Sequence, residues 1–195
     1  LRSLHERDHV QTRLLAGYAW DWVSKKNYGR VIDSHDGLQL AGRRPPPGIS
    51  FRWAHPDWQR DFNLGIGAYA DAQALFGAGE DLPATAGYAL TVRGQEFDHV
   101  GVLWGQDLIW HDGCWEVNPE LVFGSDMPQL RVAARKEKEQ RIKNGPGMRE
   151  LVRAVAGAYR ILLTRGTKTV QVWIEDPKTA QHVRTAWEAF LNSRA

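Results

Sequence analysis

Two short segments combine residue types that suit the binding of a phosphorylated ligand. The first, residues 91–100 (TVRGQEFDHV), is a largely polar stretch with one glycine between two apolar, strand-like runs. Loops at the carboxyl ends of strands are where open α/β sheets bind ligands. A glycine there lets backbone N–H groups approach a phosphate, Arg93 can neutralise its charge, and Glu96 can accept a hydrogen bond from a sugar hydroxyl. We therefore expect Arg93, Gly94 and Glu96 to contact such a ligand.

The second segment is residues 158–168 (AYRILLTRGTK), in which an apolar helix ends in Thr-Arg-Gly directly before a strand. An arginine at such a junction is held rigidly, which is what a guanidinium that stabilises phosphoryl-transfer charge requires. Arg165 is therefore the candidate catalytic residue. The alternative is structural, because the same side chain can cap the carboxyl end of the helix or pair with Glu175 or Asp176.

Strands that alternate with helices are expected around these segments. Apolar runs predict strands over residues 12–18, 88–91, 99–104 and 169–174. A charged stretch predicts a helix over residues 131–143, and apolar spacings and capping residues predict helices over residues 148–163 and from Asp176 onward. Asp112-Gly113 predicts the turn of a hairpin over residues 108–117. The pattern favours an α/β fold, with a mostly parallel sheet and helices on its faces.

The composition is that of an ordinary soluble globular protein. Of the 195 residues, 43% are hydrophobic and 25% are charged, which excludes disordered, collagen-like and disulfide-scaffold classes. We expect one domain over residues 1–195, with a loop-rich region or insertion at residues 24–86 and a charged helix and linker at residues 131–147. No apolar run approaches the roughly 18 residues that cross a bilayer, and the single cysteine, Cys114, fits a reducing compartment. The expected location is the cytoplasm, without membrane contact.

Positive charge is concentrated in one segment of the chain. Residues 131–149 hold seven basic and two acidic side chains, a charge of +5, whereas the whole chain carries +2. One interpretation is a solvated helix face with an ion pair between Glu137 and Arg141. The other is contact with single-stranded nucleic acid through the basic side chains Arg131, Arg135, Lys136, Lys138 and Arg141. The nine tryptophans serve core packing or base stacking, and composition does not separate these uses.

Three segments together resemble one group of helicases. Residues 91–100 resemble motif V of superfamily 1 helicases, and residues 159–166 resemble their motif VI. With residues 14–25 they are similar, in order, to the Schlafen group III-like DNA/RNA helicase domain family of bacterial proteins, and three ordered motifs are more specific than one. The resemblance implies a RecA-like fold of the P-loop NTPase type, the second of two such domains in a helicase, without its own phosphate loop.

The resemblance also implies roles for individual residues. It assigns Arg165 to the γ-phosphate of ATP, as the catalytic arginine. It assigns Thr91 to the nucleic acid. The other nucleotide-binding residues that it implies are Arg93, Gly94, Glu96 and Thr164.

Part of an ATPase site is absent from the sequence. No G-x-x-x-x-G-K-[ST] phosphate loop occurs, and no apolar strand ends in the Asp-Glu pair that would hold Mg²⁺. By resemblance, ATP and Mg²⁺ bind only together with a preceding first RecA-like domain. That domain is the expected partner, besides single-stranded DNA or RNA, and no cofactor is expected for the chain alone.

Two other functions stay open. The chain departs from motif V at Leu90, where His is usual, and at Gln95, where Leu is usual, which favours a non-catalytic helicase-like module that binds nucleic acid or protein. The Thr-Arg-Gly of motif VI favours the ATPase instead. A metal-dependent nuclease that uses Asp and His is the third possibility. Its candidates, His35-Asp36 and His111-Asp112, each lie beside a turn glycine without a third ligand at suitable spacing.

Overall fold

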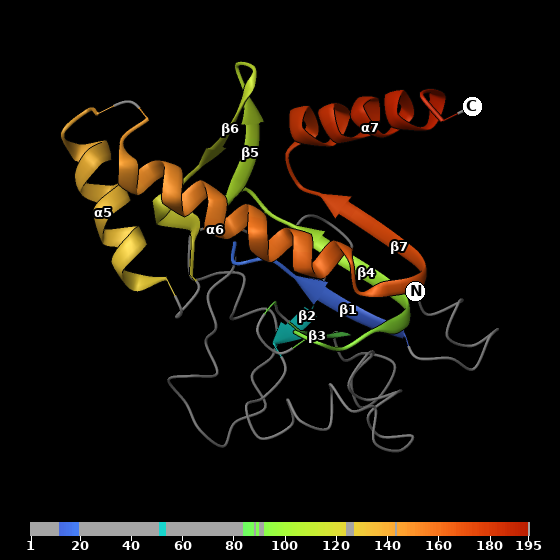
Figure 1. Cartoon of the computed structure of the whole chain (residues 1–195). Coiled ribbons are helices and arrows are strands. Elements are labelled where there is room, and N and C mark those ends of the chain that lie inside the picture. Colours follow the sequence, from blue (N-terminus) through green and yellow to red (C-terminus); the bar gives the residue numbers. More distant parts are fainter. Residues whose placement is uncertain are drawn as a thin grey trace, which may run out of the picture.

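The computed structural model of the chain describes residues 12–19, 51–53, 84–87, 89, 92–123, 127–142 and 144–194. Five strands form a parallel sheet in the order β2-β3-β1-β4-β7 (Figure 1), namely β1 (Thr12–Ala16), β2 (Phe51–Trp53), β3 (Ala84–Gly87), β4 (Phe97–Trp104) and β7 (Gly166–Ile174). An antiparallel hairpin follows β4 and consists of β5 (Leu108–His111) and β6 (Cys114–Val117). The helices among the described residues are the 3₁₀ turn η4 (Pro119–Leu121), α5 (Pro128–Glu139), α6 (Pro146–Leu163) and α7 (Pro177–Asn192). The expected α/β fold, a parallel sheet flanked by helices as in RecA-like domains, is confirmed.

Strand β4 is the buried centre of this sheet. It pairs in parallel with β1 on one side and with β7 on the other, so both edges of its backbone form hydrogen bonds. Side chains on both of its faces are buried, including Val100, Val102 and Leu103. Coverage of both faces explains why the run HVGVLW is apolar without alternation. The strand expected at residues 99–104 is therefore confirmed.

Helix α6 packs against β4 and the hairpin, and covers one face of the sheet (Figure 1). Its buried stripe contains Leu151, Val155, Tyr159 and Leu162, at spacings of three and four residues. These side chains belong to the main hydrophobic core, and full burial of each contributes roughly 1.5–3 kcal/mol. The helix expected at residues 148–163 is confirmed, and it begins two residues earlier, at Pro146.

The first turn of α6 is capped by a side chain from α5. The two carboxylate oxygens of Glu137 accept hydrogen bonds from the backbone N–H groups of Gly147 and Met148, both at 2.8 Å. A carboxylate at this end of a helix satisfies unpaired amides and interacts favourably with the helix dipole. The expected i,i+4 ion pair between Glu137 and Arg141 is therefore wrong. Helix α5 ends at Glu139, and Arg141 adopts a φ of +57° outside the helix.

Of the strand expected at residues 88–91, the structure describes only Ala89. The strand in this part of the chain is β3, which ends at Gly87, and Ala89 lies in a turn. The sequence of β3 is ATAG, whose small side chains give a weak hydrophobic signal. Its position depends instead on parallel pairing with β1, in which Ala86 is the partner of Leu14.

The remaining elements follow the expected order. Strands β1 and β7, the hairpin and the helix that begins after Asp176 are confirmed. The charged helix expected at residues 131–143 is α5, which spans residues 128–139 and so begins three residues earlier and ends four residues earlier. The hairpin turn has φ values of +46° at Asp112 and +83° at Gly113, which is the conformation that Asp-Gly favours. Of the loop-rich region expected at residues 24–86, the structure describes only residues 51–53 and 84–86, and both are strands.

Two glycines provide a test of how α6 packs on the end of β1. Gly17 lies against Tyr159, and a β-carbon at this position would overlap the phenol ring and its hydroxyl. Gly17→Ala is expected to lower the free energy of unfolding by roughly 1–3 kcal/mol, because a buried tyrosine must move. Gly157→Ala is the matched control: in α6 nothing lies within 4 Å of a β-carbon there, so it should stabilise by about 0.5–1 kcal/mol. Urea unfolding measures both changes, and an unchanged midpoint for Gly17→Ala would contradict this packing.

Candidate functional site

The two segments that resemble helicase motifs meet at the amino ends of β4 and β7. Residues 92–96 lead into β4, and Thr164-Arg165 leads from α6 into β7. The backbone N–H of Phe97 donates to the carbonyl oxygen of Arg165 at 2.8 Å. The Arg165 Nη1 group donates to the carbonyl oxygen of Gln95 at 3.0 Å. Segments that lie 70 residues apart in the chain are thus in direct contact.

The position of the loop differs from the expectation that it follows the carboxyl end of a strand. Ala89 lies in a turn, and Gln95 and Glu96 directly precede β4. Arg165 likewise precedes β7. Because β4 and β7 are parallel neighbours, both segments lie at the opposite edge of the sheet from the one expected.

The Arg165 side chain closes the carboxyl end of α6. Its Nε group donates to the carbonyl oxygen of Ile161 at 3.0 Å, and its Nη2 group donates to the hydroxyl of Thr164 at 3.1 Å. That hydroxyl lies 2.9 Å from the carbonyl oxygen of Arg160 and 3.1 Å from that of Ile161. This geometry is that of the capping alternative. Among the described residues, however, one N–H on each Nη atom keeps no protein partner, so a catalytic role for Arg165 stays a prediction.

The loop that precedes β4 presents its polar groups to solvent. Arg93, Gly94 and Glu96 are exposed, and the backbone N–H of Gln95 donates to the carbonyl oxygen of Val92 at 3.1 Å to close a turn. Gly94 has a φ of +79°, which the turn requires and which other residues adopt rarely. Within the described residues Arg93 and Glu96 form no ion pair with each other, so both remain available for the nucleotide contacts that the sequence predicts.

The basic side chains of the α5 region divide into two groups. Arg135 forms an ion pair with Glu120 at 2.8 Å, Lys138 donates to Asn118 at 3.2 Å, and Arg131 lies over the ring of Phe123 at 6.0 Å. Lys136 and Arg141 are exposed, and their side chains contact no charged partner among the described residues. Thr91, also predicted to contact nucleic acid, lies outside the described residues.

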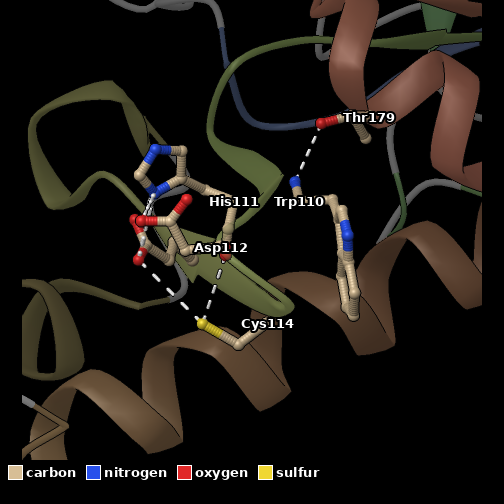
Figure 2. A network of polar contacts seen from close by, with 6 residues as sticks. Trp110, His111, Asp112, Cys114 and Thr179 are labelled. Carbon is tan, nitrogen blue, oxygen red and sulfur yellow. Dashed lines mark hydrogen bonds and ion pairs between the residues drawn. The ribbon is translucent and has the colours of Figure 1, made fainter.

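The hairpin tip contains the residues considered for a metal site (Figure 2). His111 Nδ1 lies 3.7 Å from Asp112 Oδ2 and 3.6 Å from Glu116 Oε1, and Cys114 Sγ lies 3.4 Å from the carbonyl oxygen of His111. In the part of the chain that the structure describes, no group of three or more His, Cys, Asp or Glu residues is arranged to hold a metal ion. His35 and Asp36 lie outside that part. The hairpin therefore gives the nuclease hypothesis no support.

Comparison with known families decides which group of proteins this is. Residues 2–176 match the family described as Schlafen group 3, DNA/RNA helicase domain. The chain belongs to this family. Separate comparisons with curated proteins and with solved structures found no match. The match covers the candidate motif V loop, Arg165 and the basic helix of this Schlafen group 3 domain, and it confirms the resemblance expected from the three motifs.

None of the helices in the described part of this Schlafen group 3 domain has both the length and the apolar character that a membrane span needs.

A buried polar pair in the Schlafen group 3 domain was missed by the sequence reasoning. The Tyr159 hydroxyl donates to Asp107 Oδ1 at 2.6 Å and accepts from the backbone N–H of Gly105 at 3.1 Å. The Tyr159 ring stacks on Trp104, with ring centroids 4.2 Å apart. The pair lies just past the carboxyl end of β4, at the edge of the sheet opposite to Arg165. A tyrosine in the apolar stripe of α6 was the available signal, because a buried hydroxyl needs a partner.

Burial changes the acidity of both members of this pair. It raises the pKa of Asp107 to about 6, and the hydrogen bond from Tyr159 offsets part of that effect. Burial and the neighbouring Asp107 carboxylate raise the pKa of Tyr159, so the phenol stays a donor. Asp107 Oδ2 has no hydrogen-bond partner among the described residues, so ionisation of this carboxyl is unfavourable in the folded chain.

The contribution of Asp107 to stability is expected to fall as the pH rises. Its pKa is about 6 in the folded chain against an ordinary value of 3.8, so the folded state binds the proton more tightly. The stabilisation is complete below about pH 4 and is lost as the pH rises through about 6, by roughly 3 kcal/mol in total. Asp107→Asn removes this titration, so the unfolding free energy of the variant minus that of the parent should increase between these pH values. Urea unfolding at each pH measures the difference, and a constant difference would contradict the raised pKa.

Proposed function

We propose that this Schlafen group 3 domain is the second RecA-like domain of a superfamily 1 helicase or translocase-type ATPase. In this proposal it supplies the motif V and motif VI side of an ATP site and part of a nucleic-acid-binding surface. The observation that supports the proposal is the hydrogen bond from Arg165 to the carbonyl oxygen of Gln95, which joins the two motif-like segments. A structural cap alone would not require exposed Arg93 and Glu96 in the loop that Arg165 contacts.

The residues at this edge of the sheet fit part of a nucleotide. Arg93 offers an exposed cation for phosphate oxygens, and Glu96 offers an acceptor for a ribose hydroxyl. Apart from its two chain neighbours, no described residue has an atom within 4 Å of where a Gly94 side chain would begin, so a phosphate can approach the backbone there. The described residues contain no cluster of metal ligands, so the proposal assigns Mg²⁺ and the phosphate loop to a first RecA-like domain. When bound, ATP with Mg²⁺ supplies the phosphoryl group that is transferred to water.

Arg165 has a positioning and a chemical role in this proposal. Its bonds to Ile161 and Gln95 fix the guanidinium between α6 and the loop. The unused N–H groups then face outward when a first domain closes over the nucleotide, and they stabilise charge on the γ-phosphoryl oxygens. A planar guanidinium can do both at once, whereas an ammonium group cannot.

The test of this role uses a protein that contains both RecA-like domains. Arg165→Ala should lower the ATP turnover rate by roughly 10³-fold or more, because such an arginine acts on transition-state charge, while nucleotide affinity changes little. The lost capping bonds should also lower the free energy of unfolding by about 1–2 kcal/mol. Steady-state ATPase rate, nucleotide affinity and thermal unfolding are measured for the parent and each variant.

Two further variants make this test specific to the guanidinium. Arg165→Lys should restore little turnover. Arg160→Ala removes an exposed cation one turn earlier in α6 and should leave turnover unchanged. Equal turnover in the parent and Arg165→Ala would reject the catalytic role.

Nucleic-acid contact through the α5 region is expected to depend on Lys136 and Arg141, because these side chains are exposed and unpaired among the described residues. Lys136→Glu and Arg141→Glu should each weaken binding of single-stranded oligonucleotide and reduce the slope of log affinity against log salt concentration by about one. Arg153→Glu, exposed on α6, makes the same charge change elsewhere and serves as the control. Fluorescence anisotropy from low to high salt measures the slope. Identical slopes for all three variants would mean that the basic region is only a solvated face.

One observation favours a second candidate function, a helicase-like module without catalysis. The three hydrogen bonds of Arg165 within the chain account for this side chain without any nucleotide. Such a module would bind nucleic acid through the same basic side chains but would show no dependence of ATP turnover on Arg165. The ATPase measurement therefore separates the two candidates.

A further inference from the structure

Helix α7 lies outside the residues that match the family, because the match ends at residue 176 and the helix begins at Pro177. Its first turns are fixed to the hairpin. Asp176 Oδ2 accepts from both the backbone N–H and the hydroxyl of Thr179, each at 2.7 Å. The backbone N–H of Trp110 in turn donates to the Thr179 hydroxyl at 2.8 Å (Figure 2), and the Trp110 ring stacks on His182 with centroids 3.7 Å apart. The beginning of α7 is thus a rigid attachment.

The second half of α7 projects beyond this attachment (Figure 1) and exposes apolar side chains. Trp187 is 59% exposed, Phe190 43% and Leu191 49%. The Trp187 and Phe190 rings stack with centroids 5.6 Å apart and planes inclined by 28°. The guanidinium of Arg194 lies over the Phe190 ring, 4.5 Å from its centroid. Positions 187, 190 and 194 therefore form a ladder of two rings and one planar cation along one side of the helix, which we call the α7 ladder.

The charge of this helix favours a negatively charged ligand. Residues 177–194 contain three cationic side chains, Lys178, Arg184 and Arg194, and one anionic side chain, Glu188. No ion pair engages Arg184 or Arg194 in the described part of the chain. An exposed ring beside unpaired guanidinium groups suits a ligand that combines flat π-systems with phosphates.

We propose that the α7 ladder is a base-stacking site for single-stranded nucleic acid, with bases on Trp187 and phosphates on Arg184 and Arg194. This inference rests on the proposed nucleic-acid function and gives it a second, chemically different surface. The α5 region offers cations, but the large apolar side chains exposed in and just after that helix are Val132 and Ile142, which are not aromatic. Its contacts are therefore with phosphates, whereas the α7 ladder recognises bases.

Self-association of α7 is the main alternative occupant, and the available area argues against it. Two half-exposed aromatic rings offer about 200 Å². A stable protein interface buries about 800 Å² on each partner. Single bases, by contrast, need only one ring face each, which the exposed Trp187 provides.

The experiment compares two fluorescent 15-nucleotide probes, oligothymidylate and an abasic strand with the same number of phosphates. The full chain should bind oligothymidylate more tightly than the abasic strand. Trp187→Ala combined with Phe190→Ala should weaken oligothymidylate binding about tenfold or more and leave abasic binding nearly unchanged, because only stacking is removed. Leu191→Ala, an equally exposed apolar side chain without a ring, is the matched control and should bind both probes as the parent does. Anisotropy measures affinity, and thermal unfolding checks that all variants are folded.

Three other results would each reject a different part of the proposal. If the double variant retains the preference for bases while Lys136→Glu weakens binding, the proposed function stands and the α7 site is rejected. If the parent binds neither probe, the nucleic-acid function itself fails, and the α7 site with it. If light scattering shows that the parent is a dimer and the double variant a monomer with unchanged oligothymidylate affinity, the ladder is a contact between two copies of this chain.

Discussion

The parallel pairing between β4 and β7 determines where the candidate ligand-binding residues lie. Val100 is the partner of Val170 and Trp104 is the partner of Ile174, so the two strands run side by side over most of their length. Whatever precedes one strand must therefore lie next to whatever precedes the other. The loop at residues 92–96 and Arg165 are neighbours for this reason, although neither local sequence indicates contact with the other. A change that shifted this register would separate them.

Helix α6 connects the two edges of the sheet. Near its end Tyr159 reaches Gly105 and Asp107, beyond the carboxyl end of β4, and the junction that follows holds Arg165 at the amino end of the same strand. The buried stripe of α6 packs against β4 and so fixes both the Tyr159 contacts and the position of Arg165 relative to that strand. The sequence indicated no role for Asp107, yet burial raises the pKa of its carboxyl group, and its hydrogen bond to Tyr159 helps to position the helix that precedes Arg165. Packing and polar contacts thus act together at this helix.

Much of the fold could be predicted from the sequence, because several elements carry strong local signals. The spacing of Leu151, Val155 and Leu162 predicts α6, and the Asp-Gly pair predicts the hairpin turn. Strand β3 could not be found in this way, because its small side chains carry little local signal and it forms a strand through pairing with β1 and β2. The sequence also did not reveal that the loop at residues 92–96 lies at the amino ends of the strands and not at their carboxyl ends.

In the candidate site, likewise, the sequence indicated which residue matters but not which residues it contacts. Residue types pointed to Arg165 as a fixed cation, and the structure agrees that it is fixed. Its partners could not be foreseen, because Gln95 is 70 residues away and offers only a backbone oxygen, which every residue has. Glu137 is a similar case. Its spacing from Arg141 suggested a local pair, whereas the folded chain brings the amino end of another helix within reach.

The Glu137 cap has a mechanical consequence under the proposed function, in which the domain moves along nucleic acid. A nucleic-acid strand bound at Lys136 would pull on α5 one residue away from Glu137. The Glu137 carboxylate in turn accepts two hydrogen bonds from the first turn of α6. Helix α6 has 18 residues and is therefore a strut about 27 Å long, with Arg165 just beyond its far end. Tension on the nucleic acid would therefore reach the first turn of α6 through these two hydrogen bonds. Force at one end of this helix and chemistry at the other would then be linked through the Glu137 carboxylate and the backbone of α6.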